Sequence, residues 1–363
     1  MKILILGFAK IKYMPYLNLY LDNIDTNKNE VHVLYWNRDL QFEDIPQVKN
    51  VIWHEFKCYQ EDEVSPITKI GSFIKFRKFT KSVVRKEKFD FVIALTSVLA
   101  VLVSDLLIGK YKNRFFFDYR DVTYERLPLY KILLWTIVKN SRKTFISSNA
   151  FRGYFPQSQQ EKIYLTCNFL PDSLDHREDK ELYGIKSDKI RIAFWGVIRN
   201  EEINRKIIER VSNDERFELH YYGREQGTAK KLKSYAEKIC AENVFFHGEY
   251  APEERYAFVK NTDIIHNIYD DNKMMLAMGN KFYDGLIFRI PQICTEGSFM
   301  GKTAEKFGVG KAVNPNEVDF TTSVFDYFKA LDEKCFFDNC NNALDQVLED
   351  NKKSINYIKA TLN

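Results

Sequence analysis

Short, mainly apolar runs recur along this chain, and helix-length segments separate most of them. The runs occupy residues 2–6, 31–36, 51–53, 91–95, 115–117, 144–147 and 163–166, and then 190–195, 218–222, 244–247, 263–268 and 292–295. A strand that is apolar on both faces is typical of a parallel sheet, because helices cover such a sheet on both sides. The pattern therefore predicts an α/β fold in which helices alternate with buried parallel strands.

The runs fall into two series, and this division predicts two domains. A chain of 363 residues is longer than one typical core and fits two domains of similar size. A charged stretch at residues 176–181 separates the two series. We expect an N-terminal Rossmann-like domain at residues 1–172, a linker at 173–188, a second Rossmann-like domain at 189–340 and a C-terminal helix at 341–363. The sequence shows no tandem repeat, so the halves are expected to be alike only as folds.

Composition and short motifs exclude several classes of protein. Hydrophobic residues make up 45% of the chain and charged residues 29%, as in ordinary globular proteins, so extensive disorder is not expected. The net charge of +4 arises from mixed charges and indicates no nucleic-acid partner. The cysteines form no CxxC pair and the histidines no ligand spacing, which predicts reduced thiols and no bound metal. The loop after the first run lacks the G-x-G-x-x-G fingerprint of dehydrogenases.

No segment has the pattern of a signal peptide or a membrane span. The apolar start at residues 2–6 is too short for a signal-peptide core, and no small-residue cleavage site follows it. Polar residues interrupt the apolar stretch at 91–109, which fits a buried strand followed by a buried helix better than a span. We therefore expect a cytoplasmic protein.

The stretch at residues 272–295 predicts a loop, a helix beginning near Asn280, and a strand after Pro291. Helical spacing brings Asn280, Lys281 and Asp284 together near the first turn of that helix. Unpaired N–H groups and a lysine at a helix N-terminus form an anion site, and Asp284 can accept hydrogen bonds from hydroxyls. A phosphate next to a ribose would suit this arrangement. The alternative is an amphipathic helix with a solvated Lys–Asp pair.

Two further segments place charged residues where parallel strands end. Asp118, Arg120 and Asp121 lie at the end of the run that starts at residue 115, and strand ends line the ligand crevice of open α/β sheets. Gly196 and Arg199 follow the run at 190–195. The alternatives are that one of the two aspartates caps the following helix, and that Arg199 is an ordinary surface residue.

The residues NKFYDGLIFRIPQI, from Asn280 to Ile293, resemble the donor-site segment of GT-B glycosyltransferases of the retaining family 4 type, which act in bacterial capsule and exopolysaccharide synthesis. Asp118–Asp121, residues 146–168 and residues 194–199 also resemble segments of that family. The resemblance implies two Rossmann-like domains facing each other across a cleft, with the C-terminal helix packing back on the first domain.

The resemblance also implies roles for residues on the donor side. The acidic residue that holds the nucleotide ribose corresponds to Asp284, beside Asn280 and Lys281. Gly196 would let the backbone approach the diphosphate, Arg199 would pair with it, and Arg205 would be a second cation.

On the acceptor side, the resemblance places Arg120 and Asn168 near the acceptor and makes Asp121 and Asp118 the catalytic candidates. Asp121 would orient or deprotonate the attacking hydroxyl. One departure is clear. Leu276 stands where the family usually has its first glutamate, and a leucine cannot hydrogen-bond a sugar hydroxyl, so the sequence does not predict whether the sugar keeps its configuration.

The function implied is transfer of a hexosyl group from a nucleotide diphosphosugar, with a UDP-sugar expected, to a growing, lipid-linked bacterial surface polysaccharide. No Asp-x-Asp motif occurs, so no metal and no other cofactor is expected. Two alternatives remain: a nucleotide-sugar epimerase of the same fold, and a non-catalytic sugar-binding or scaffold protein of a polysaccharide assembly complex.

A basic stretch at residues 69–88 predicts contact with a membrane. Eight cations and one acid accumulate there on a predicted helix whose apolar face includes Ile70, Phe73 and Phe76. A basic amphipathic helix can rest on anionic lipid, which would hold the protein at the inner face of the cytoplasmic membrane. A solvated helix face is the alternative.

Overall fold

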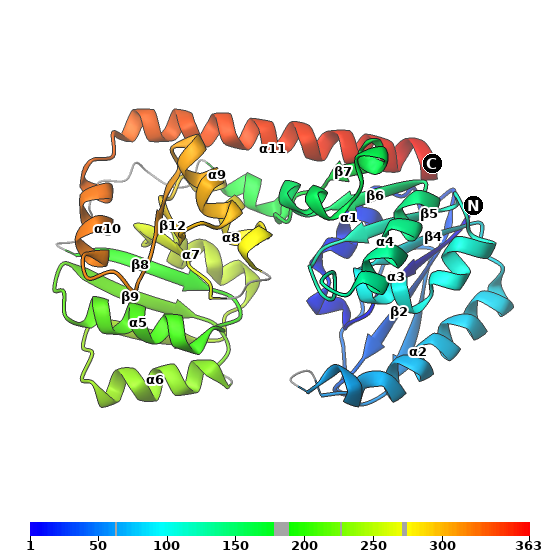
Figure 1. The fold of residues 1–363 in the computed structure, drawn as a ribbon, viewed down its shortest axis with the longest axis horizontal. Coiled ribbons are helices and arrows are strands. Elements are labelled where there is room, and N and C mark those ends of the chain that lie inside the picture. The colour runs from blue at the N-terminus through cyan, green and yellow to red at the C-terminus, as the bar shows by residue number, and fades with distance from the viewer. Residues whose placement is uncertain (62–63, 178–188, 226, 271–273) are drawn as a thin grey trace. The chain divides into compact units, whose positions relative to one another are not determined.

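The computed structural model describes residues 1–61, 64–177, 189–225, 227–270 and 274–363. They form two compact units (Figure 1). The first contains Met1–Cys167 together with Glu349–Asn363, and the second contains Asn168–Leu348. The sequence placed the corresponding limits at residues 172 and 341.

The first unit is built on a seven-stranded parallel sheet of order β3-β2-β1-β4-β5-β6-β7. Its strands are β1 (Lys2–Leu6), β2 (Glu30–Asn37), β3 (Val51–Lys57), β4 (Phe91–Leu95), β5 (Phe115–Tyr119), β6 (Lys143–Ile146) and β7 (Ile163–Leu165). Its helices are α1 (Asn18–Leu21), α2 (Pro66–Glu87), α3 (Ser97–Leu102), α4 (Pro128–Asn140) and the end of α11 (Glu333–Leu362). Ile358 and Leu362 of α11 are fully buried in the same core cluster as Ile3 and Phe116.

The second unit is built on a six-stranded parallel sheet of order β10-β9-β8-β11-β12-β13. Its strands are β8 (Ile190–Trp195), β9 (Phe217–Tyr222), β10 (Val244–Gly248), β11 (Ile264–Asn267), β12 (Gln292–Thr295) and β13 (Gly310–Val313). Its helices are α5 (Glu201–Ser212), α6 (Thr228–Lys238), α7 (Arg255–Val259), α8 (Asn280–Ile287), α9 (Phe299–Phe307), α10 (Phe320–Lys329) and the first part of α11.

The predicted α/β class with two parallel, Rossmann-like sheets is confirmed. Each apolar run in the sequence became a strand within a few residues of its expected limits, because covering both faces of the sheet buries nearly every side chain of the central strands. Residues 91–109 form β4, the short helix α3 and a further turn at Leu106–Lys110, as the interrupting polar residues indicated. No helix in the described ranges is long and apolar enough to cross a bilayer.

The apolar face expected on the basic helix is largely absorbed by the core of the first unit. Phe76 of α2 is fully buried, and its ring centroid lies 5.5 Å from that of Trp36. Phe73 also packs on Trp36, at 6.0 Å. Of the three apolar residues named from the sequence, Ile70 alone is classed as exposed. Of the predicted apolar face, Ile70 remains available to a membrane, and membrane contact itself stays a prediction.

The two sheets repeat one polar arrangement at matching positions. In the first, Lys2 Nζ lies 2.9 Å from Glu30, which contacts His32 at 2.7 Å, and His32 contacts His54 at 2.7 Å. In the second, the corresponding set is Arg191, Glu218, His220 and His247, with successive distances of 3.4, 3.4 and 3.0 Å. The halves are thus alike in more than fold, contrary to the expectation. The sequence did not reveal this likeness, because the residues of each arrangement come from three separate strands.

Candidate functional site

The first turn of α8 presents unpaired backbone donors at the edge of the second sheet. Gly279, the N-cap, has no side chain that could bond to the helix. The N–H of Phe282 bonds back to the Gly279 carbonyl at 3.0 Å, whereas the N–H groups of Asn280 and Lys281 bond to no acceptor among the described residues. Asn280 itself is exposed. Such a helix start attracts anions through its N–H groups and its partial positive charge.

Lys281 adds a full positive charge at this helix start. Its Nζ atom lies 4.1 Å from the centroid of the Phe194 ring, in β8, and 5.4 Å from that of Tyr269, which follows β11. Within the described part of the chain it forms no ion pair. Because cation–π contacts hold the ammonium without neutralising it, Lys281 remains able to bind an anion.

Asp284 lies one turn deeper and is 2% exposed. Its Oδ2 atom accepts a hydrogen bond from Trp195 Nε1 at 2.9 Å and lies 3.7 Å from Arg255 Nη1. Burial raises the pKa of the Asp284 carboxyl, against the opposing effects of Arg255, Trp195 and Lys281. The carboxylate thus ties α8 to β8 and α7, while Oδ1 bonds to no described residue and is left for another donor.

The loop after β8 supplies the remaining donor-side candidates. Gly196 has φ +108°, a conformation that favours glycine. Arg199 is exposed, and its guanidinium makes no ion pair with any residue that the structure describes. Arg205 differs, because it bonds to Glu201 at 2.9 Å and stacks on the Tyr235 ring at 4.6 Å. The Arg205 guanidinium is therefore already engaged by side chains of α5 and α6.

Backbone geometry accounts for the glycines at the ends of β9 and β10: Gly248 has φ +82°, and Gly223 lies against the backbone of Gly196. A Cβ on Gly223 would lie 2.1 Å from the carbonyl oxygen of Gly196, so no other residue fits there. The Gly223 N–H bonds to the Gly248 carbonyl at 2.8 Å. Turn and loop packing accounts for these two glycines without a ligand.

Sequence reasoning missed the buried polar residues behind the site. Arg255 is 7% exposed and donates to Ser173 Oγ at 2.7 Å in addition to pairing with Asp284. His266 is fully buried, accepts from the Ile268 N–H at Nδ1, and contacts Asn204 Oδ1 through Nε2 at 3.0 Å. Burial first, and then the charge of Lys281, lower the pKa of His266 to about 3. No local pattern marks these residues, since their partners are far away in sequence.

In the first unit, Asp118 and Arg120 form a buried pair. Arg120 lies 2.7 Å from Asp118 Oδ2, which also accepts from Tyr20 Oη at 2.8 Å, and Asp118 is fully buried. The Arg120 guanidinium stacks over Tyr16 at 5.0 Å. Asp118 therefore positions Arg120 and has no surface for a substrate, which weighs against the catalytic role expected for it.

Asp121 and Asn168 lie in different surroundings. Asp121 is exposed just after β5, and its charge, second to burial, raises the pKa of Tyr16. Asn168 is half-buried and is the first residue of the second unit. The structure thus brings Asp118, Arg120 and Asp121 together at one strand end, whereas it places Asn168 in the other unit.

A small cavity of about 200 Å³ opens beside the ends of β1, β2 and β3. The loops after these strands line it, with Lys10, Tyr13, Arg38 and Tyr59 among the lining residues. Lys10 is 2% exposed and pairs with Asp39 at 2.7 Å. None of these residues was singled out from the sequence.

One group among the described residues has donor atoms close enough to hold a metal ion: Glu30, His32 and Glu87. The ammonium of Lys2 already lies 2.9 Å from Glu30 and 2.7 Å from Glu87. Glu30 and His32 belong to β2 and Glu87 ends α2, so the group includes neither Asp118 of β5 nor Asp121 after it. That the protein needs no metal stays a prediction.

Comparison with solved structures identifies the fold. Sucrose-phosphate synthase from Thermosynechococcus elongatus superposes with a TM-score of 0.72 at 10% identity, covering 100% of this chain and 98% of that one. HepE from Anabaena in complex with UDP and glucose gives 0.65 at 13% identity, with 98% of each chain covered. WaaG, a glycosyltransferase involved in lipopolysaccharide biosynthesis, gives 0.63 at 11% identity and 99% coverage of both. The expected GT-B architecture is confirmed. No family model and no curated protein sequence matches the chain.

Proposed function

We propose that this protein is a glycosyltransferase that moves a hexosyl group from a nucleotide diphosphosugar, with a UDP-sugar as donor, to a growing, lipid-linked bacterial surface polysaccharide. The observation that carries the proposal is the start of α8, where two N–H groups bond to no described residue and Lys281 adds an ammonium that forms no ion pair among the described residues. HepE was solved with UDP and glucose on the same fold, and another structure of this fold, described as trehalose-6-phosphate from E. coli, was solved with UDP-2-fluoro glucose bound.

The donor diphosphate is proposed to bind at this helix start, with Arg199 as a second cation. Fixed donors and cations lower the barrier for a leaving diphosphate because its charge grows in the transition state. Asp284 Oδ1 would accept from a ribose hydroxyl. Arg205 contributes less than the sequence implied, since Glu201 already neutralises it.

The acceptor is proposed to bind in the first unit. Asp121 is the exposed carboxylate of the β5 strand end and would orient or deprotonate the attacking hydroxyl. The 200 Å³ cavity beside β1–β3 offers tyrosines and cations to a sugar acceptor. Contact of the exposed part of α2 with anionic lipid would keep the protein beside a lipid-linked acceptor.

Incubation of the protein with UDP-sugars, with and without a lipid-linked acceptor, tests the proposal. Transfer is expected only when the acceptor is present, and it should survive EDTA. Conversion of the UDP-sugar by the protein alone into an isomeric UDP-sugar would instead identify an epimerase. Nucleotide binding with no turnover of any donor would indicate a scaffold protein.

A further inference from the structure

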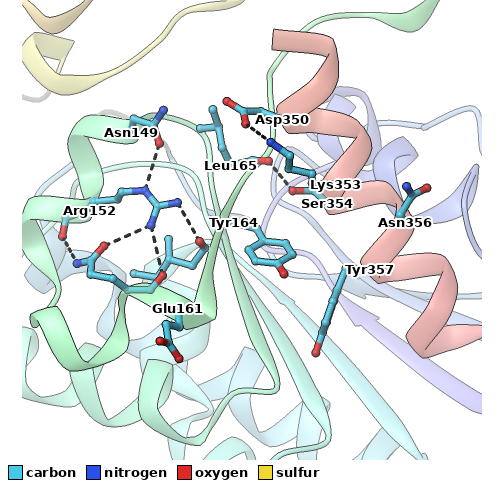
Figure 2. Close-up of a pocket in the computed structure, with 12 residues that line it drawn as sticks. Asn149, Arg152, Glu161, Tyr164, Leu165, Asp350, Lys353, Ser354, Asn356 and Tyr357 are labelled. Carbon is cyan, nitrogen blue, oxygen red and sulfur yellow. Dashed lines mark hydrogen bonds and ion pairs between the residues drawn. The ribbon is translucent and has the colours of Figure 1, made fainter. Parts of the chain in front are cut away.

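A cavity of about 590 Å³ opens in the first unit between the segment before β7, β7 itself and the last turns of α11 (Figure 2). This volume is typical of a small-molecule site. Arg152 and Tyr164 line one side, and Lys353 and Tyr357 of α11 line the other. Gln160 and Asn356 are also among the lining residues. None of the residues expected at the donor or acceptor sites lines it.

Two tyrosines provide an aromatic wall. The ring centroids of Tyr164 and Tyr357 lie 5.4 Å apart with an interplanar angle of 74°, so the rings meet edge to face. Lys143 lies 3.8 Å from the Tyr164 centroid and 4.8 Å from that of Tyr357, and it also donates to the Glu161 carbonyl at 2.9 Å. These contacts hold both rings in place. A rigid aromatic side chain with a hydroxyl can pack on the C–H face of a sugar and still hydrogen-bond at its edge.

The guanidinium of Arg152 also lines this cavity, where Asp350 is the acidic side chain that acts on its charge. Arg152 donates to Asn149 Oδ1 at 3.2 Å, to Gln160 Oε1 at 3.3 Å and to the Ile163 carbonyl at 2.9 Å, all of them neutral acceptors (Figure 2). Within the described residues it forms no ion pair. Partial burial lowers the pKa of Arg152, and the charge of Asp350 opposes this effect without a direct ion pair. Such a charge is stabilised by a carboxylate or phosphate from a ligand.

Lys353 brings a second cation to the rim. Its Nζ atom lies 3.5 Å from Asp350 and 3.8 Å from Glu349, distances at which both contacts are loose, and its side chain is 61% exposed. It can therefore turn toward a bound anion at little cost.

We propose that this cavity binds an acidic oligosaccharide, with the Tyr164–Tyr357 wall against the sugar rings and Arg152 and Lys353 facing the acidic group. Side-chain amides at Gln160 and Asn356 line the same space and suit sugar hydroxyls. That the bound saccharide is a segment of the acceptor glycan, held while its end reacts, rests on the proposed function. Binding itself does not.

Calorimetric titration with trigalacturonate, a trisaccharide with a carboxylate on each unit, tests the proposal. Maltotriose is the neutral control of equal length, and inorganic phosphate is the control for a bare anion. Trigalacturonate should bind at least roughly tenfold more tightly than either control, since a charged contact in a partly buried site contributes about 1.5–3 kcal/mol. No binding of trigalacturonate, or equal binding of maltotriose or phosphate, would overturn the inference.

Two neighbouring lysines of α11 make a matched pair of variants. Lys353→Glu should weaken trigalacturonate binding roughly tenfold, by replacing attraction with repulsion. Lys352→Glu makes the same charge change at an exposed residue that does not line the cavity, and it should have no effect beyond about twofold. Tyr357→Ala should abolish binding. Equal losses in both lysine variants would overturn the inference.

UDP titrations of the same proteins separate this inference from the proposed function. If the protein binds UDP but not trigalacturonate, the cavity assignment is wrong and the proposed function is unaffected. Trigalacturonate binding that Lys353→Glu weakens, in a protein that binds no nucleotide, defeats the proposed function and leaves the cavity assignment standing.

Discussion

Asp284 illustrates how one side chain serves both the fold and the proposed donor site. Its Oδ2 atom satisfies Trp195 and faces Arg255, whereas its Oδ1 atom is left for a ligand. Removing the carboxyl altogether would leave the Trp195 N–H and the Arg255 charge buried without a partner, which costs several kcal/mol. A simple alanine substitution would therefore confuse loss of binding with loss of folding.

Asp284→Asn is the cleaner change, because its amide oxygen can still accept from Trp195. We expect nucleotide affinity to fall roughly tenfold to a hundredfold, as a charge-assisted hydrogen bond contributes about 1.5–3 kcal/mol. Calorimetry measures the affinity, and thermal melting measures the cost to folding. Trp195→Phe is the control for the structural contact, since it removes the indole N–H that Asp284 accepts together with part of the packing around it. Unchanged nucleotide affinity in Asp284→Asn would remove Asp284 from the donor site.

Asp121 and Asp118 are three residues apart and should respond in opposite ways. Asp121→Asn alters an exposed carboxylate, so we expect the melting temperature and nucleotide affinity to hold while turnover falls by about 10²–10⁴, the usual worth of general-base help. Asp118→Asn removes the charge that faces buried Arg120, so the protein should melt markedly earlier. If Asp121→Asn melts early but turns over normally, Asp121 is a structural residue.

The buried imidazole of His266 makes the free energy of unfolding depend on pH. The folded protein holds its pKa at about 3, below the ordinary value of 6.5, so the unfolded chain binds the proton first. The stability that the neutral imidazole of His266 contributes is therefore complete above pH 6.5 and is lost as the pH falls toward 3. Between pH 6.5 and 3 the free energy of unfolding should fall by a few kcal/mol less in His266→Gln than in the parent protein. Parallel declines in chemical denaturation series for the two proteins would contradict this.

At the scale of elements, the strands could be predicted and the polar contacts between them could not. A run such as Phe91–Leu95 carries its own signal, because being apolar on both faces has one common structural explanation. The pairing of Asp284 with Arg255, or of Asp118 with Tyr20, depends on which elements become neighbours, and residue spacing does not encode that. The same reason hid the Glu–His–His arrangement shared by both sheets.

In helix α2, the spacing of apolar residues did not predict which of them are buried in the core. Helical spacing predicts one apolar face for Ile70, Phe73 and Phe76, whereas Phe76 fills the core beside Trp36. Two cations of α2, Arg77 and Lys81, also pair with Asp105 at 3.0 and 2.6 Å. What remains for a membrane is an exposed set of isoleucines, Ile67, Ile70 and Ile74, beside Lys75 and Lys78.

This smaller surface still predicts binding to anionic lipid. We expect the protein to float with anionic but not with neutral liposomes, and to be released by high salt, because each cation near such a surface contributes about 1 kcal/mol. Lys75→Glu with Lys78→Glu should abolish flotation. Lys230→Glu with Lys238→Glu, the same change on exposed residues of α6, should not. Equal flotation with both lipids makes α2 a solvated helix.

At the scale of the whole molecule, the same fold occurs in chains whose sequences are almost entirely different. Superposition over essentially the full chain at 10–13% identity means that the order of strands and helices is retained with few of the same side chains. Strand order depends on a broad pattern of apolar residues, which many sequences satisfy, whereas chemistry depends on particular groups. For this reason the proposed donor site rests on the residues of this chain, above all on the start of α8.

Titration of UDP into the protein and two lysine variants tests that claim most directly. Lys281→Met keeps an apolar side chain against Phe194 but removes the ammonium, and Lys302→Met removes an exposed ammonium from the neighbouring helix α9. We predict that UDP binds the parent and Lys302→Met equally and binds Lys281→Met at least roughly tenfold more weakly, since a charge-assisted contact to phosphate is lost. Equal UDP affinity in all three proteins, or no binding of UDP to any, would contradict a diphosphate site at the start of α8.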